Sequence, residues 1–157
     1  MTTVTDVTIV GAGPFGLSLA AHLRAHDMNF RIIGNPMQSW RTLMPKGMLL
    51  KSAGFASTLY DPGRTFTLRR FCEEQGVPYH DFDLPIPLET FTSYGEAFQK
   101  RFAPDLEDEN LVALKPCPEG FELSMESGRS FKTRKVVLAV GIDYFRNIPE
   151  SLASLPK

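Results

Sequence analysis

A glycine-rich turn close to the amino end constrains the fold of this chain more than any other feature. Gly11, Gly13 and Gly16 follow the spacing G-x-G-x-x-G directly after the β-branched run "VTIV". Pro14 suits the first turn of a following helix, where its missing N–H costs little. A second apolar run, "FRII", comes after a stretch rich in Leu and Ala. The segment therefore predicts a β-α-β unit whose first strand is buried on both faces.

Each glycine has a separate physical role in a unit of this kind. The first permits the tight turn, the second lets a pyrophosphate approach the backbone, and the third packs the helix against the strand. The phosphates then lie on free N–H groups at the positive end of the helix dipole. The turn therefore predicts a dinucleotide-binding site.

The second strand of the unit ends without the expected acid. In many such units an Asp or Glu at this point binds the adenosine ribose, but here the strand is followed by Gly34 and Asn35. A neutral strand end would suit the 2′-phosphate of NADP, yet no Arg follows closely. Alternatively, the main chain of Gly34 and the side chain of Asn35 bind the ribose of an unphosphorylated dinucleotide.

The composition excludes several other classes of function. The 157 residues are 43% hydrophobic, and 17 basic side chains balance 18 acidic ones. Such a chain suits one domain, spanning 1–157, and its balanced charge does not suggest affinity for nucleic acid or a membrane surface. The partner that we expect from the glycine turn is instead a small molecule. The apolar run at 7–10 is too short to span a bilayer or to direct export, so we expect a cytoplasmic location.

The metal-binding residue types also lack the spacing of a metal site. His22 and His26 lie four residues apart on the first predicted helix, but no third ligand is nearby. Cys72 and Cys117 are far apart and form no CxxC motif. We therefore expect no metal.

After the second strand, the pattern divides into three parts. Residues 35–63 lose periodicity and are expected to form an irregular, functional segment. Two helices follow: one capped by Thr65 and ended by Gly76, and one capped by Thr90 that carries an aromatic stripe. After Pro104, the runs "NLVALK", "GFELSM" and "SFKTRKVVLAVG" predict strands. The last repeats the pattern of the first strand, so we predict an α/β, Rossmann-like fold with a parallel sheet and an antiparallel β-meander.

Over essentially its whole length the chain resembles the amino-terminal part of FAD-dependent monooxygenases and related flavoproteins with two dinucleotide-binding domains. The matching pieces are "VTIVGAGPFGLSLAAHL", "SWR" followed by "MPKGMLLKS", an aromatic helix before "NLVALK", and "KVVLAVG" before "IP". It looks most like the branch of flavin-containing monooxygenases and lysine and ornithine N-hydroxylases, because it lacks the CxxxxC of disulfide reductases.

The resemblance implies roles for individual residues. The backbone of the glycine turn would hold the FAD pyrophosphate, residues 35–63 would face the flavin, and the main chain of Leu111 or Val112 would contact adenine. Trp40 and Arg41 match a Trp-Arg pair near the flavin, although Trp40 could instead fill the core and Arg41 could pair with a carboxylate of the scaffold. No catalytic side chain is implied. The predicted cofactor-binding residues are Gly11, Gly13, Pro14, Phe15, Gly16, Gly34, Asn35, Trp40, Arg41, Leu111, Val112 and Gly141.

The resemblance also implies an activity. In the resembling enzymes NADPH reduces the bound FAD, and a second G-x-G-x-x-G binds the NADPH; the 157 residues hold only one such motif. We therefore expect the FAD-binding portion of an NAD(P)H-dependent flavoprotein oxidoreductase, a monooxygenase, that is incomplete and inactive alone. Two alternatives stay open: an NADP-binding stand-alone reductase, and a non-catalytic Rossmann-like module that self-associates through an exposed half-core.

Overall fold

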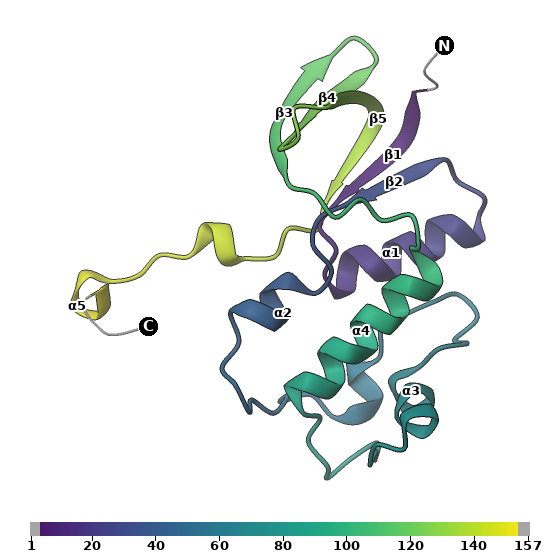
Figure 1. Cartoon of the computed structure of the whole chain (residues 1–157), viewed down its shortest axis with the longest axis vertical. Coiled ribbons are helices and arrows are strands. Elements are labelled where there is room, and N and C mark those ends of the chain that lie inside the picture. Colours follow the sequence, from purple (N-terminus) through teal and green to yellow (C-terminus); the bar gives the residue numbers. More distant parts are fainter. Residues whose placement is uncertain (1–3, 154–157) are drawn as a thin grey trace.

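The computed structural model describes residues 4–153 and has the predicted α/β architecture (Figure 1). Its centre is a parallel sheet in which β1 (Thr5–Val10) lies between β2 (Phe30–Ile33) and β5 (Ser130–Leu138). β1 is almost wholly buried, as expected of a strand covered on both faces. Both strands that the sequence predicts for the β-α-β unit are confirmed.

The predicted antiparallel meander extends this sheet on one side. β3 (Leu111–Cys117) and β4 (Gly120–Met125) pair antiparallel, and β4 pairs antiparallel with β5. The full strand order is β2-β1-β5-β4-β3. The Rossmann-like fold with an antiparallel meander is therefore confirmed.

The helices lie together on one side of the parallel strands (Figure 1). α1 (Pro14–Ala25) packs against β1 and β2 and is itself covered by α4 (Leu88–Phe102), with α3 (Leu68–Gln75) beyond. Two short elements follow β5: the 3₁₀ turn η2 (Asp143–Phe145) and α5 (Glu150–Ala153), which lead away from the body of the molecule (Figure 1).

Both predicted helix caps are wrong. Thr65 does not cap α3, because its backbone N–H and its hydroxyl are bonded to the carboxylate of Asp61, which delays the helix. The cap is Thr67, whose hydroxyl accepts a backbone N–H of the first turn. α4 begins directly after Pro87, so Thr90 lies inside it. The predicted end of α3 at a left-handed glycine is confirmed.

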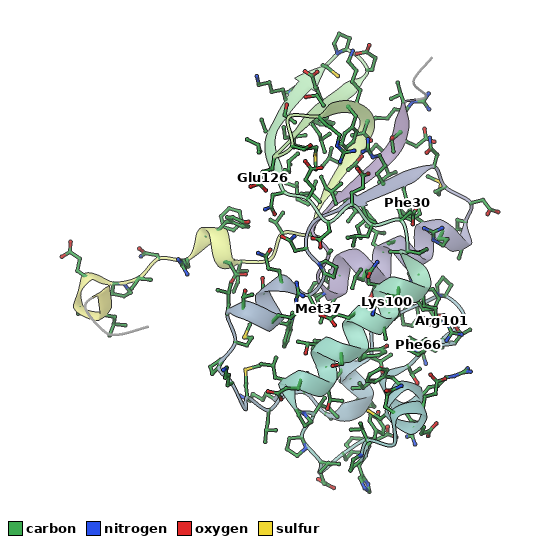
Figure 2. The ribbon with its side chains drawn as sticks, viewed as in Figure 1. Phe30, Met37, Phe66, Lys100, Arg101 and Glu126 are labelled. Carbon is green, nitrogen blue, oxygen red and sulfur yellow. The ribbon has the colours of Figure 1, made fainter. Side chains whose placement is uncertain are left out.

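The segment 35–63 is less irregular than predicted. It contains α2 (Gln38–Thr42) and the 3₁₀ turn η1 (Gly54–Ser57). α2 is too short to show a hydrophobic period, which is why the sequence pattern missed it. The fully buried Met37 precedes it, and its thioether fills the space above Gly95 on α4, so the entry to α2 is held against the core (Figure 2).

Aromatic side chains of α4 form the centre of the main core, as the stripe predicted. Tyr94 and Phe98 are completely buried and contact the ring of Phe66. The Tyr94 hydroxyl donates to the Phe66 carbonyl over 2.8 Å. The Arg101 guanidinium covers the Phe66 ring at 5.0 Å from its centroid, and Figure 2 shows the two residues beside each other.

Between residues 4 and 153, no helix combines the length and apolarity needed to cross a membrane.

The aromatic core yields a stability prediction. Phe98→Ala is expected to lower the free energy of unfolding by about 3–5 kcal/mol, because the surrounding rings cannot collapse into the cavity. Phe145→Ala removes the same ring where it is 76% exposed, and should change stability by no more than about 0.5 kcal/mol. Urea denaturation measures both values, and equal losses in the two variants would contradict the burial of Phe98.

Candidate dinucleotide-binding site

The glycine turn is packed so tightly that side chains cannot enter two of its positions. Gly11 has φ +113°, and a Cβ there would collide with the carbonyl of Ala139, directly after β5. A Cβ on Gly16 would collide with the carbonyl of Gly11. The Ala139 N–H in turn donates to the Val10 carbonyl over 2.7 Å. The ends of β1 and β5 and the start of α1 are thus held in one compact corner.

Gly13 differs from both neighbours because it faces open space. No atom lies within 4 Å of the position that its Cβ would take. It is the N-cap of α1 and offers no side chain to the helix terminus, and the first turn holds no acidic residue. Among the described residues, no hydrogen bond uses the N–H groups of Gly13, Phe15 or Gly16. Open space beside unpaired N–H groups at a helix start fits a phosphate group.

Gly34 closes the same corner from the end of β2. Its φ is +127°, a conformation that favours glycine, and its Cβ would lie 3.3 Å from both the Gly11 Cα and the Ala12 nitrogen. The missing acid at this position is thus explained, since any side chain would be strained here. The Asn35 amide, for which the sequence predicts a contact with the ribose, donates in the fold to the carboxylate of Asp108.

A segment before β3 runs beside the end of β2 and carries acidic side chains to it. The Gly34 N–H donates to the Glu107 carbonyl and the Glu107 N–H donates to the Ile32 carbonyl, each over 3.0 Å. No sequence pattern predicts that this segment lies beside the site. The acidic run "EDE" at 107–109 marks the segment in the sequence, but the pattern does not show which strand the run would lie beside.

Arginines hold two of these acids in place. Arg31 donates to both carboxylate oxygens of Glu107 over 2.6 Å, while its guanidinium stacks 3.3 Å from the Phe131 ring centroid. Arg129 pairs with both Glu107 and Glu109. Hydrogen bonds from Arg31 are the main cause that lowers the pKa of Glu107. Bonds from Ser127, and then Arg129, lower the pKa of Glu109 to about 2. We call Arg31, Glu107, Glu109 and Arg129 the acidic-segment clip.

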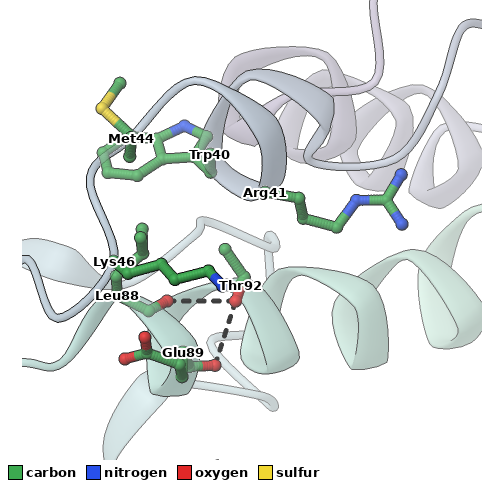
Figure 3. Close-up of a pocket in the computed structure, with 7 residues that line it drawn as sticks. All are labelled: Trp40, Arg41, Met44, Lys46, Leu88, Glu89 and Thr92. Carbon is green, nitrogen blue, oxygen red and sulfur yellow. Dashed lines mark hydrogen bonds between the residues drawn. The ribbon is translucent and has the colours of Figure 1, made fainter. Parts of the chain in front are cut away.

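Trp40 and Arg41 lie on α2 and form part of a shallow pocket (Figure 3). Trp40 is partly buried and meets the Phe91 ring edge-on at 4.6 Å, so it packs on the core as the alternative interpretation held. Arg41 lies 3.4 Å from a carboxylate oxygen of Glu96, which is a scaffold contact. The remaining residues lining the pocket are Met44, Lys46, Leu88, Glu89 and Thr92.

The other predicted site residues are spread around the glycine turn. Phe15 is 88% exposed at the start of α1. Gly141 has φ +70° just beyond the Ala139 contact. Val112 is exposed at an irregularity in the pairing of β3 with β4, whereas Leu111 packs on the smaller core beneath the meander. Slightly earlier in the chain, Glu107 exchanges backbone hydrogen bonds with the end of β2 and with Gly34, and Asp108 accepts a hydrogen bond from Asn35 just after the strand.

The described residues hold no group of three or more His, Cys, Asp or Glu side chains placed to bind a metal ion. His22, one of the two histidines on α1, stacks on the Tyr60 ring at 5.3 Å.

A comparison with known protein families decides the class of ligand. Residues 8–143 match the FAD-NAD(P)-binding family, and this range includes the glycine turn, the acidic segment and all of β5. The chain belongs to the FAD-NAD(P)-binding family. The resemblance to flavin- and nicotinamide-dependent enzymes, and the prediction of a dinucleotide cofactor of the FAD or NAD(P) type, are thereby confirmed.

Solved structures share the fold of this FAD-NAD(P)-binding chain at low sequence identity. A flavin-containing monooxygenase from Stenotrophomonas maltophilia is 18% identical, with a TM-score of 0.71. The match covers 89% of this chain and 39% of the monooxygenase chain. L-lysine 6-monooxygenase from Pseudomonas syringae is 18% identical with a TM-score of 0.70, covering 98% and 41%. A bacillithiol disulfide reductase from Staphylococcus aureus is 19% identical with a TM-score of 0.67, covering 89% and 39%. The likeness shows the fold, and the chain spans well under half the length of each.

The acidic-segment clip yields a pH prediction. The pKa of Glu109 is about 2 in the fold, against an ordinary value of 4.5, so its pairing stabilises the protein above about pH 4.5. That stabilisation is lost as the pH falls from 4.5 towards 2, where the folded carboxylate takes up its proton. Thermal unfolding of wild type and Glu109→Gln should therefore differ at pH 6 and converge towards pH 2.5.

Glu122→Gln is the matched control for this prediction. Glu122 lies on β4 opposite Lys132 and forms no ion pair within the described residues. Its substitution is expected to leave the melting temperature close to that of wild type at every pH. A gap between wild type and Glu109→Gln that stays constant from pH 6 to pH 2.5 would contradict the assigned role of Glu109.

Proposed function

We propose that this chain is the FAD-binding portion of an NAD(P)H-dependent flavoprotein oxidoreductase of the monooxygenase type. The observation that carries the proposal is the open space at Gly13 beside the unpaired N–H groups at the start of α1. These groups would hold the FAD pyrophosphate. FAD supplies the hydride and electron transfer, and the chain supplies binding and orientation.

The charges around the end of β2 favour FAD over NADP at this turn. An NADP 2′-phosphate is commonly met by an arginine in this region. Here the Asn35 amide donates to the carboxylate of Asp108, and Arg31 is already paired with Glu107. An acidic corner would repel a 2′-phosphate but would accept hydrogen bonds from the two hydroxyls of an unmodified ribose.

The monooxygenase type rests on the sequence resemblance together with two of the structural relatives. The flavin-containing monooxygenase and the lysine monooxygenase share the fold, but so does the disulfide reductase. The absence of a CxxxxC motif from the chain favours the monooxygenases. In the proposed enzyme, the pocket beside Trp40 and Arg41 would lie on the flavin side.

Exposed apolar side chains support a role within a larger assembly. Ile142, Tyr144 and Phe145 follow β5 and are 83%, 78% and 76% exposed, and Leu138 at the end of β5 is 62% exposed. Further protein would cover these side chains in the proposed enzyme. They also make self-association the second candidate, in which a non-catalytic module pairs through this surface.

The proposal predicts that FAD binds and that Gly13 is needed for binding. Added FAD should raise the melting temperature of the wild-type protein. When the protein is titrated into FAD, the flavin fluorescence should fall. Gly13→Val should weaken FAD binding by at least about tenfold, because a side chain would occupy the space of the pyrophosphate. It should cost only about 1 kcal/mol of stability, the usual effect of a poor N-cap.

A control and two alternative outcomes complete this experiment. Ala25→Val also introduces a valine, but at the exposed far end of α1. This control is expected to leave FAD affinity unchanged. Stabilisation by NADP but not FAD would support the stand-alone reductase. No response to either nucleotide, together with self-association in sedimentation, would support the interaction module. Either result would overturn the proposed function.

A further inference from the structure

We propose that Asp108 binds the hydroxyls of the adenosine ribose, and so replaces the acid that is missing from the end of β2. The inference rests on the proposed FAD-binding function and names the residue that would bind the ribose at that site. The observation behind it is the contact between Asp108 and Asn35, across a gap of 73 residues in sequence.

The end of β2 cannot itself supply an acid. Gly34 has a positive φ, and its Cα faces the backbone of Gly11 and Ala12, so a side chain there would strain the turn. A carboxylate at this corner must therefore come from another segment. The segment before β3 is the one that lies there, since its Glu107 exchanges backbone hydrogen bonds with Ile32 and Gly34.

The three consecutive acids of this segment have different surroundings. Glu107 and Glu109 both pair with Arg129, and Glu107 also pairs with Arg31. Asp108 stands between them, is exposed, and within residues 4–153 is hydrogen-bonded only by the Asn35 amide. That bond uses one carboxylate oxygen. The other oxygen is left to accept hydrogen bonds from a ligand.

The position of Asp108 suits the ribose of a dinucleotide bound at the glycine turn. Asn35 directly follows Gly34, and Gly34 touches the turn that would hold the pyrophosphate. In FAD the adenosine ribose is bonded to that pyrophosphate through its 5′ carbon. A carboxylate held at the end of β2 can accept from the vicinal 2′ and 3′ hydroxyls, and charge-assisted bonds of this kind are strong.

The proposed role carries a specificity. The two arginines of the clip balance its two glutamates, so the clip carries no net charge. Asp108 is the one acid of the segment that no arginine of the clip pairs with, and its carboxylate supplies the uncompensated negative charge. A 2′-phosphate would be repelled by the carboxylate, whereas a free 2′ hydroxyl would be bound. Asp108 would therefore select adenosine ligands without a 2′-phosphate.

The test is a titration of wild type and Asp108→Asn with FAD, followed by competition with ADP-ribose and with 2′-phospho-ADP-ribose. Asp108→Asn should weaken FAD binding by at least about tenfold, because the amide carries no charge and has a single acceptor oxygen, for which the ribose would compete with the Asn35 amide. The wild type should prefer ADP-ribose over its 2′-phosphate, and the variant should lose most of that preference.

The matched control is Asp105→Asn. Asp105 is an exposed acid of the same loop, but it pairs with Arg24 of α1, away from the glycine turn. Its substitution should leave FAD affinity within about twofold of wild type, and unchanged melting temperatures would show that both variants fold. If wild type binds FAD but Asp108→Asn binds it equally well, the inference is wrong and the proposed function stands. If wild type does not bind FAD, the proposed function itself fails.

Discussion

The close packing of Gly11 is the contact on which the rest of the site depends. At this residue the ends of β1, β2 and β5 come together, because Gly11 lies against the carbonyl of Ala139 and its N–H donates to the Ile33 carbonyl over 2.8 Å. A side chain would push the strands apart and lift α1 from the sheet. The same packing leaves the N–H groups at the start of α1 facing open space at Gly13, which is the geometry that a pyrophosphate needs.

A second constraint is electrostatic. The meander is joined to the β-α-β unit through β5, through a small apolar cluster shared by β1, β2 and β4, and through the backbone bonds of Glu107 at the end of β2. The acidic-segment clip adds ion pairs that link β2 to the loop between β4 and β5. Arg31 stacks on Phe131 while pairing with Glu107, so the ion pair is partly shielded from water and worth more than an exposed one. This link fixes the course of residues 106–110 beside the strand end, and so places Asp108.

The glycine at the end of β2 replaces the acid that is common at this position, and the reason for the replacement is visible only in the tertiary structure. From the sequence, Gly34 suggests either a lost ribose contact or a preference for NADP. In the fold, its backbone conformation is required by the turn, and an acid from a distant segment lies next to Asn35. The Asn35 amide donates to Asp108, and this neighbouring acid is a feature of the site that the sequence pattern did not predict.

Much of the fold followed from the sequence alone, because local signals determine it. The spacing of Gly11, Gly13 and Gly16, the β-branched runs and the aromatic stripe of α4 determined the β-α-β unit, the meander and the main core. Short-range signals misplaced the helix caps at Thr65 and Thr90. At Thr65 hydrogen bonds to Asp61 override the capping preference, and at Thr90 the helix has already begun after Pro87. The helix α2 was missed because it is too short to show a hydrophobic period. Only the tertiary structure decided which side chains surround the site, since charge pairs such as Arg31 with Glu107 join segments that no local pattern connects.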